Sequence, residues 1–301
     1  MSFRASARLG MGRLASMVLA VLLGVCAFGA AAGDVNELRG KYRELRAQLQ
    51  QNSFQRPLHI VSSQEGDTLR GDVYAVLDHP FTDLNTGLKD PSDWCDILIL
   101  PFNTKYCHAA QGNGGPMLQV RIGRRYDQPV EHAYRVDFTL RQVVAAADYF
   151  ETRLNAASGP VGTRDYRITL SAVPLDNGRT FMHLSYSYGF GAMGRLAMRA
   201  FLATAGASKV GFTITGRDAS GQPVHIGGVR GAIERNVMRY YLAIDSYLAS
   251  LRTPPDQRVD KRIQTWFNST ERYPRQLREM DRSTYVAMKR DEYERQQSRI
   301  E

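Results

Sequence analysis

The sequence has little that points to covalent, metal or cofactor chemistry. It contains only three cysteines, and its six histidines do not have the spacing of a zinc site. Neither an H-E-x-x-H nor a G-x-S-x-G motif occurs, so a metalloprotease helix and a hydrolase nucleophile elbow are both missing. Carboxylates paired at a useful spacing are missing as well. We therefore expect no catalytic residue, no metal and no cofactor.

Long apolar runs are also missing, except near the start of the chain. There, a basic head with three arginines precedes an apolar stretch, residues 17–28, and a run of small residues that ends at Ala32. This order is typical of a secretory signal peptide. We predict cleavage after Ala32 and a periplasmic or secreted protein; an uncleaved membrane anchor is the alternative. Lipidation at Cys26 is disfavoured because the preceding residue, Val25, is not small.

Cleavage would leave two cysteines, Cys95 and Cys107. In an oxidising compartment such a pair indicates a disulfide, and two buried free thiols are the alternative. The spacing matches no common metal site, so we predict the disulfide. The formal net charge of +9 falls to about +6 without the signal arginines, which favours anionic membrane or envelope surfaces over nucleic acid as partners.

Hydrophobic periodicity predicts helices on both sides of a run of strands. An apolar stripe at helical spacing predicts a leading amphipathic helix over residues 34–51. Alternating residues then predict antiparallel strands with one covered face and one wet face. The expected strands are 69–77, 118–122, 134–140, 149–155, 166–172, 182–188 and 210–215. The expected helices after the first strand are 80–88, 93–100, 194–207 and 231–251.

A G-x-G-x-x-G pattern runs from Gly189 to Gly194, between an expected strand and an expected helix. Such a pattern can bind a dinucleotide in a parallel β-α-β unit. The preceding strand alternates tyrosine and serine, however, whereas a central parallel strand is usually apolar throughout. We therefore interpret the glycines as turn residues and expect no nucleotide cofactor.

The order of the elements resembles the helix-grip fold of the START-like (SRPBCC) superfamily, which includes lipid-transfer proteins and polyketide cyclases. The resemblance covers Leu69 to Leu251, and it also rests on the stretch from Asp72 to Phe81 and on Trp94. It implies an α+β fold in which a curved antiparallel sheet of about seven strands surrounds a long C-terminal helix. A lipocalin-like barrel, the second choice, would not explain the helices that follow the first strand.

The resemblance implies an apolar cavity between the sheet and this helix, although the same residues could pack as an ordinary core. Tyrosines would give such a cavity a few polar points, because a buried phenol needs a hydrogen-bond partner. The expected lining residues are Tyr134, Val136, Phe138, Ile168, Leu170, Tyr186, Tyr188, Phe212, Ile214, Tyr240 and Ile244.

Arg235 and Arg239 lie one turn apart on the long helix. Together they could hold a carboxylate or phosphate head group at the mouth of the cavity. The alternatives are a solvated helix face and an ion pair between Glu234 and Arg230.

We predict four parts of the chain: a signal peptide (1–32), a leading helix with its connector (33–67), a helix-grip domain (68–252) and a charged, partly helical tail (253–301). Basic and aromatic residues of the tail could dock on an anionic membrane, or the tail could pack on the domain or on a partner protein. These aromatic residues are Trp266, Phe267, Tyr273 and Tyr285.

The expected function is non-catalytic binding of a lipid or other apolar small molecule. A cyclase- or hydrolase-type enzyme is one alternative, and a structural or interaction protein with a filled core is another.

Overall fold

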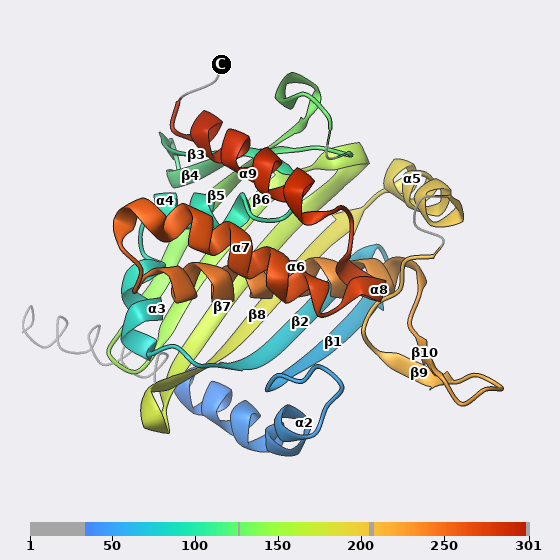
Figure 1. Ribbon diagram of the computed structural model, residues 1–301, viewed down its shortest axis with the longest axis horizontal. Helices are drawn as coiled ribbons and strands as arrows, with labels where there is room; N and C mark the ends of the chain where they lie inside the picture. Colours follow the sequence, from blue (N-terminus) through green and yellow to red (C-terminus); the bar gives the residue numbers. More distant parts are fainter. Residues whose placement is uncertain (1–33, 126, 205–207, 299–301) are drawn as a thin grey trace, which may run out of the picture.

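The computed structural model describes residues 34–125, 127–204 and 208–298 (Figure 1). The predicted signal peptide, including Cys26, lies outside these residues, as do residues 205–207 of the helix expected at 194–207. Within the described ranges no helix is both long enough and apolar enough to cross a membrane.

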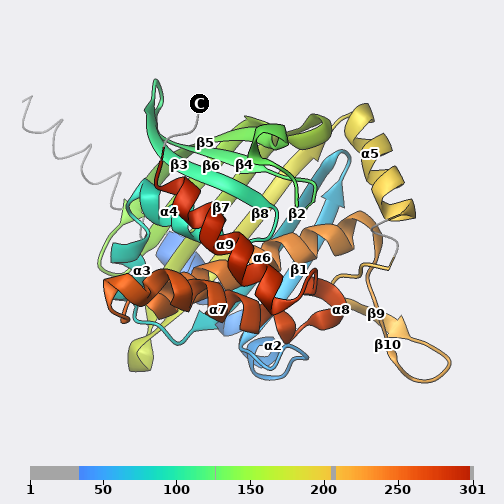
Figure 2. The ribbon, with the colours of Figure 1, turned by 45° about the horizontal axis from the view of Figure 1, so that its top comes forward.

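An eight-stranded antiparallel sheet forms the centre of the molecule, in the order β1-β2-β8-β7-β6-β5-β4-β3. Its strands are β1 (Leu58–Glu65), β2 (Thr68–Leu77), β3 (Thr104–Gly112), β4 (Gly115–Ile122), β5 (Tyr134–Ala145), β6 (Phe150–Ser158), β7 (Thr163–Leu175) and β8 (Arg179–Phe190). Two helices, α3 (Phe81–Gly87) and α4 (Pro91–Leu98), lie between β2 and β3 in the chain, and the long helix α6 (Gly228–Ser250) packs across the inner face of the sheet (Figures 1 and 2). The predicted α+β helix-grip architecture is confirmed.

A disulfide ties the helical insertion to the edge of the sheet. Asp90 caps α4, because its side chain accepts a hydrogen bond from the backbone N–H of Ser92 at 2.9 Å. Cys95 of α4 then bonds to Cys107 of β3, with the two Cα atoms 5.2 Å apart. The predicted disulfide is confirmed.

Close contact between α6 and β2 depends on a glycine. A Cβ atom on Gly71 would lie 3.2 Å from side-chain atoms of both Ile233 and Val237. Both of these α6 residues are completely buried. A larger residue at position 71 would therefore push the helix away from the sheet.

The leading helix covers part of the outer face of the sheet. Residues 34–44 are helical and α2 (Arg46–Gln50) follows them. Four apolar residues of this segment form a second hydrophobic cluster with residues of β2, β7 and β8 and with Tyr149. The four are Val35, Leu38, Leu45 and Leu49. The outer face is therefore covered at this point, although the strand pattern predicted a wet face.

The strand expected at residues 210–215 does not join the main sheet. Instead, β9 (Ile214–Arg217) pairs with β10 (Pro223–His225) in a separate two-stranded hairpin. Ile214 is 46% exposed, so the prediction that it lines an inner cavity was wrong. The preceding helix, α5, spans Ala192–Ala203. Short 3-10 turns occupy Val130–His132, Pro160–Gly162, Asp176–Gly178 and Pro255–Gln257.

The G-x-G-x-x-G pattern begins at the end of β8, and β8 pairs antiparallel with both β2 and β7. A dinucleotide fingerprint instead follows a parallel strand. Gly189 ends up inside β8 and Gly194 inside α5, so the glycines lie at a change from strand to helix.

The C-terminal residues belong to the main core. The helices α7 (Arg258–Glu271), α8 (Pro274–Leu277) and α9 (Arg282–Gln296) pack on α6 and β3. The four aromatic residues of the tail are buried in the same hydrophobic cluster as the inner face of the sheet. In this arrangement they are not available to a membrane surface.

Asp245 of α6 connects the helix to two segments that flank the first strands. It accepts a hydrogen bond from Arg56 at 2.8 Å, and its other oxygen lies 3.0 Å from Nε2 of His79. Burial alone would raise the pKa of Asp245, but the hydrogen bond with His79 and the charge of Arg56 together lower it. Because the folded pKa is lower than the unfolded one, the carboxylate stabilises the fold above about pH 4, and this contribution is lost as the pH falls through the folded pKa.

Asp245→Asn is expected to lower the free energy of unfolding by about 1–3 kcal/mol near neutral pH. The difference from the wild type should shrink as the pH falls below about 4, because Asp245 then becomes neutral in the wild type as well. Urea denaturation at several pH values measures both effects. Asp137→Asn, which removes a largely exposed ion pair with Arg135, is the control and should change stability by less than about 1 kcal/mol. A difference that is constant from neutral to acidic pH would contradict the assignment.

Candidate ligand-binding site

Four tyrosines meet at one end of the space between the sheet and α6. They are Tyr166 of β7, Tyr186 and Tyr188 of β8, and Tyr240 of α6, and we call them the tyrosine cluster. Residues two apart on a strand point to the same face, so Tyr186 and Tyr188 both face inward. The ring centroids lie 5.3 Å apart for Tyr166 and Tyr188, 5.7 Å for Tyr186 and Tyr188, and 5.3 Å for Tyr186 and Tyr240.

Three hydroxyl groups of the tyrosine cluster have no protein partner among the described residues: those of Tyr186, Tyr188 and Tyr240. Tyr166, by contrast, shares a hydrogen bond of 2.7 Å with Thr163. Burial raises the pKa of all four phenols, so they are neutral at physiological pH. Three neutral hydroxyl groups are therefore available to the polar atoms of a bound molecule.

Arg235 and Arg239 lie beside the tyrosine cluster. They are only 4% and 7% exposed, so this side of α6 is not a solvated face. The positive charge of Arg235 opposes the rise that burial gives to the pKa of Tyr188, and Arg239 does the same for Tyr240. Burial, and then repulsion by Arg239, lowers the pKa of Arg235 to about 10. The arginines and the tyrosines therefore share one electrostatic environment.

Glu234 does not pair with Arg230, the other arrangement that the sequence allowed. Its carboxylate is completely buried. It accepts hydrogen bonds from the hydroxyls of Ser62 and Thr213, both at 2.7 Å, and from the backbone N–H groups of Phe212 and Thr213 at 2.6 and 2.9 Å. Arg230 instead donates to the carbonyl of Ser62 at 2.8 Å. Glu234 thereby fixes residues 212–213 and β1 to α6.

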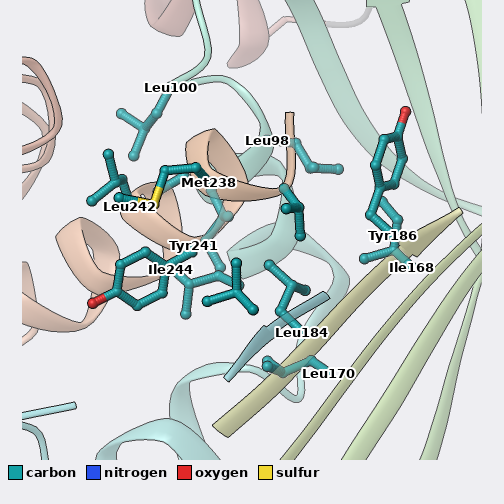
Figure 3. Close-up of a cluster of buried hydrophobic side chains, with 14 of the residues drawn as sticks. Leu98, Leu100, Ile168, Leu170, Leu184, Tyr186, Met238, Tyr241, Leu242 and Ile244 are labelled. Atoms are coloured by element: carbon teal, nitrogen blue, oxygen red, sulfur yellow. The ribbon is translucent and has the colours of Figure 1, made fainter. Parts of the chain in front are cut away.

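The apolar residues predicted to line a cavity are part of the main core. Figure 3 shows Ile168 and Leu170 of the sheet opposite Tyr241 and Ile244 of α6. None of the five predicted aliphatic and phenylalanine residues on the strands and α6 is more than 3% exposed. They are Val136, Phe138, Ile168, Leu170 and Ile244.

Two predicted residues lie away from the tyrosine cluster. Phe212 is buried, but its aromatic neighbours are Phe54 and Tyr273, at centroid distances of 5.6 and 5.5 Å. Tyr134 is half-buried at the start of β5, and the guanidinium of Arg124 lies 4.9 Å from its ring centroid. Tyr166 was not among the predicted site residues, although its alternating position on β7 indicated an inward side chain.

A cavity of about 500 Å³ lies on the opposite, outer face of the sheet. It is open to solvent and lies between residues 34–44 and a row of residues that face one another across four neighbouring strands. The row consists of Tyr74, His183, Ser171 and Glu151. The strand alternation predicted a wet face for the sheet, but it did not indicate that a helix covers part of that face.

The side chains around this outer cavity are largely paired with one another. Nε2 of His183 lies 2.7 Å from a carboxylate oxygen of Asp72, and the His183 ring stacks on Tyr74 at 4.2 Å. The hydroxyl of Tyr149 donates to Glu151 at 2.6 Å. The contacts of His183 link β8 to β2, and the hydrogen bond of Tyr149 is local to the start of β6, on the side of the sheet where the leading helix packs.

Comparison with known proteins finds no sequence family and only a distant likeness to solved structures. No family model and no curated protein matches the sequence. Among solved structures, a conserved protein from Geobacillus kaustophilus has a TM-score of 0.36 at 11% identity, over 60% of this chain and 95% of its own. A START superfamily protein from Mycobacterium smegmatis has a TM-score of 0.31 at 13% identity, and the match covers 49% of this chain and 92% of that protein. The Zhui aromatase/cyclase from Streptomyces sp. R1128 has a TM-score of 0.30 at 16% identity, and the match covers 47% of this chain and 73% of that protein. Two of these three neighbours are thus named as a START superfamily protein and an aromatase/cyclase, and the likeness of this chain to them is distant and concerns the fold alone.

Proposed function

We propose that this protein is a non-catalytic carrier that binds a small apolar molecule between the inner face of the sheet and α6. The observation that carries the proposal is the tyrosine cluster, whose three free hydroxyl groups lie between apolar residues of the main core and the two buried arginines. Ligand sites commonly combine an apolar wall with a few polar groups that fix the orientation of the ligand. Burial of apolar ligand surface there would contribute about 25 cal/mol per Å².

Entry of the ligand would take place on the side of α6 that carries Asn236 and Tyr240. Both residues are half-buried, whereas the neighbouring α6 residues Val237 and Met238 are completely buried. The opposite side of the helix is fixed by the hydrogen bonds of Glu234 and Asp245. A bound molecule would therefore displace side chains at the tyrosine cluster and leave the contact between α6 and β2 intact.

We also propose that the carrier works outside the cytoplasm. The Cys95–Cys107 disulfide supports this location, because disulfides persist in oxidising compartments and are rare in the cytosol. It agrees with the signal peptide that the sequence predicts.

Native mass spectrometry of the full chain, purified from an exporting host, tests the carrier function. We expect an additional mass that disappears on extraction with organic solvent. Binding of 1-hexadecanol, measured by displacement of the fluorescent probe N-phenyl-1-naphthylamine, then locates the site. The double variant Tyr186→Phe with Tyr188→Phe should bind the alcohol about 3- to 10-fold more weakly, because it loses two hydrogen-bonding hydroxyls.

Tyr74→Phe is the matched control, since it removes a phenol hydroxyl from the outer face of the sheet. It should leave binding of the alcohol unchanged. A protein that is always free of ligand and shows no saturable binding of the probe would contradict the proposal. So would an equal loss of affinity in Tyr74→Phe and in the double variant.

A further inference from the structure

Arg235 is a buried cation with little in the protein to balance it. Its side chain makes one long hydrogen bond, of 3.4 Å, from Nη1 to the carbonyl of Val210. Its Nε atom is buried and has no partner within the described part of the chain. Because burying an unpaired charge costs several kcal/mol, the position favours an anion that the chain does not supply.

The neighbouring charged residues do not balance the positive charge of Arg235. Arg239 donates to Oε1 of Glu279 at 2.6 Å, and Lys209 lies 3.1 Å from Oε2 of the same carboxylate. Glu279 thus already forms ion pairs with two cations, Arg239 and Lys209. We call the group of Arg235, Arg239, Lys209 and Glu279 the cationic corner, and it contains three positive charges and one negative charge.

Glu234 is adjacent to Arg235 in the sequence but does not balance it. Both of its carboxylate oxygens accept hydrogen bonds from Ser62, Phe212 and Thr213. It is also not among the groups that shift the pKa of Arg235, whereas the carboxylate of Glu279 raises that pKa. Arg235 therefore belongs to the cationic corner and lies beside the tyrosine cluster.

We propose that the apolar ligand carries a carboxylate, and that Arg235 binds this group while the tyrosine hydroxyls hydrogen-bond around it. The inference rests on the proposed function and narrows the ligand to long-chain carboxylates. The planar guanidinium fork matches a carboxylate geometrically. Arg239 binds the carboxylate of Glu279 one turn further along the helix, which provides an internal example of the same pairing.

The test compares hexadecanoate with 1-hexadecanol, which has the same chain length but no charge. Both are measured on the full chain by probe displacement, at about pH 8. A charge-assisted hydrogen bond contributes about 1.5–3 kcal/mol, so the wild type should bind hexadecanoate about 10- to 100-fold more tightly. Arg235→Met should abolish this preference, because the variant has no charge to pair with the carboxylate.

Arg252→Met is the control for net charge. Arg252 follows α6 in the chain, and its side chain is 69% exposed. This variant should keep the preference for hexadecanoate. A control variant that loses the preference as completely as Arg235→Met would indicate a general charge effect and overturn the assignment to Arg235.

The outcomes separate this inference from the proposed function. Equal binding of hexadecanoate and 1-hexadecanol by the wild type would overturn the carboxylate and leave the carrier function standing, whereas binding of neither would overturn both. Hexadecyl phosphate is a third ligand, and tighter binding of it than of hexadecanoate would overturn the choice of a carboxylate. These comparisons use the wild type alone, so they hold even where Arg235→Met does not fold.

Discussion

Replacing Glu234 by alanine is expected to lower the free energy of unfolding by about 3–5 kcal/mol. The substitution leaves buried donors on Ser62 and Phe212, and half-buried donors on Thr213, without an acceptor. Each buried unsatisfied group costs about 1–3 kcal/mol. The same change detaches residues 212–213 and β1 from α6. Denaturation in urea, followed by circular dichroism, measures the loss.

Two further variants make this result specific. The stability of Glu234→Gln should fall between those of the wild type and Glu234→Ala. The amide oxygen of glutamine remains as an acceptor, but its NH2 group would face other hydrogen-bond donors. Glu294→Ala, at an exposed position of α9, should stay within about 0.5 kcal/mol of the wild type. A loss of less than about 1 kcal/mol in Glu234→Ala would contradict the hydrogen bonds assigned to the Glu234 carboxylate.

Trp266→Ala is expected to destabilise the whole protein by about 3–5 kcal/mol. The indole is 3% exposed, stacks on Tyr285 at a centroid distance of 5.1 Å, and donates from Nε1 to the carbonyl of Arg239 at 3.2 Å. Because it contacts both α9 and α6, its loss should affect the sheet and the C-terminal helices together. A single unfolding transition at a lower urea concentration is the expected result.

Two separate transitions in Trp266→Ala would contradict this, since they would mean that the C-terminal helices unfold independently of the sheet. Trp266→Phe keeps most of the apolar volume and loses the hydrogen bond. It should therefore be destabilised by only about 1–2 kcal/mol.

The strand pattern of the sequence predicted most of the sheet, and its failures have local causes. β1 was missed because Ser62 occupies an inward position, where it binds Glu234 and interrupts the apolar alternation. β3 was missed because Thr104 to Cys107 are all buried, so the strand has no wet face. The run from Val210 to Thr215 looked like a strand, yet Phe212 and Thr213 direct their N–H groups to a carboxylate rather than to another strand.

The sequence could place Arg235, Tyr186, Tyr188 and Tyr240 near one another, because strand and helix periodicity determine which way they face. It could not identify their partners. Glu279 lies 40 residues after Arg239 in the chain, in a charged segment without an apolar pattern. The charge balance at the site depends on that contact, and periodicity carries no information about it.

Lys289 of α9 illustrates the order in which this protein can complete its fold. Its buried ammonium group donates to the carbonyls of Pro101 and Thr104, which precede it by 188 and 185 residues in the chain. During synthesis the sheet therefore emerges long before the helix that covers its β3 edge. Contacts between such distant segments slow folding, because the intervening chain must first be ordered. A chain that is exported before α9 is available would cross the membrane while its core is still open, and it would close that core only on the far side.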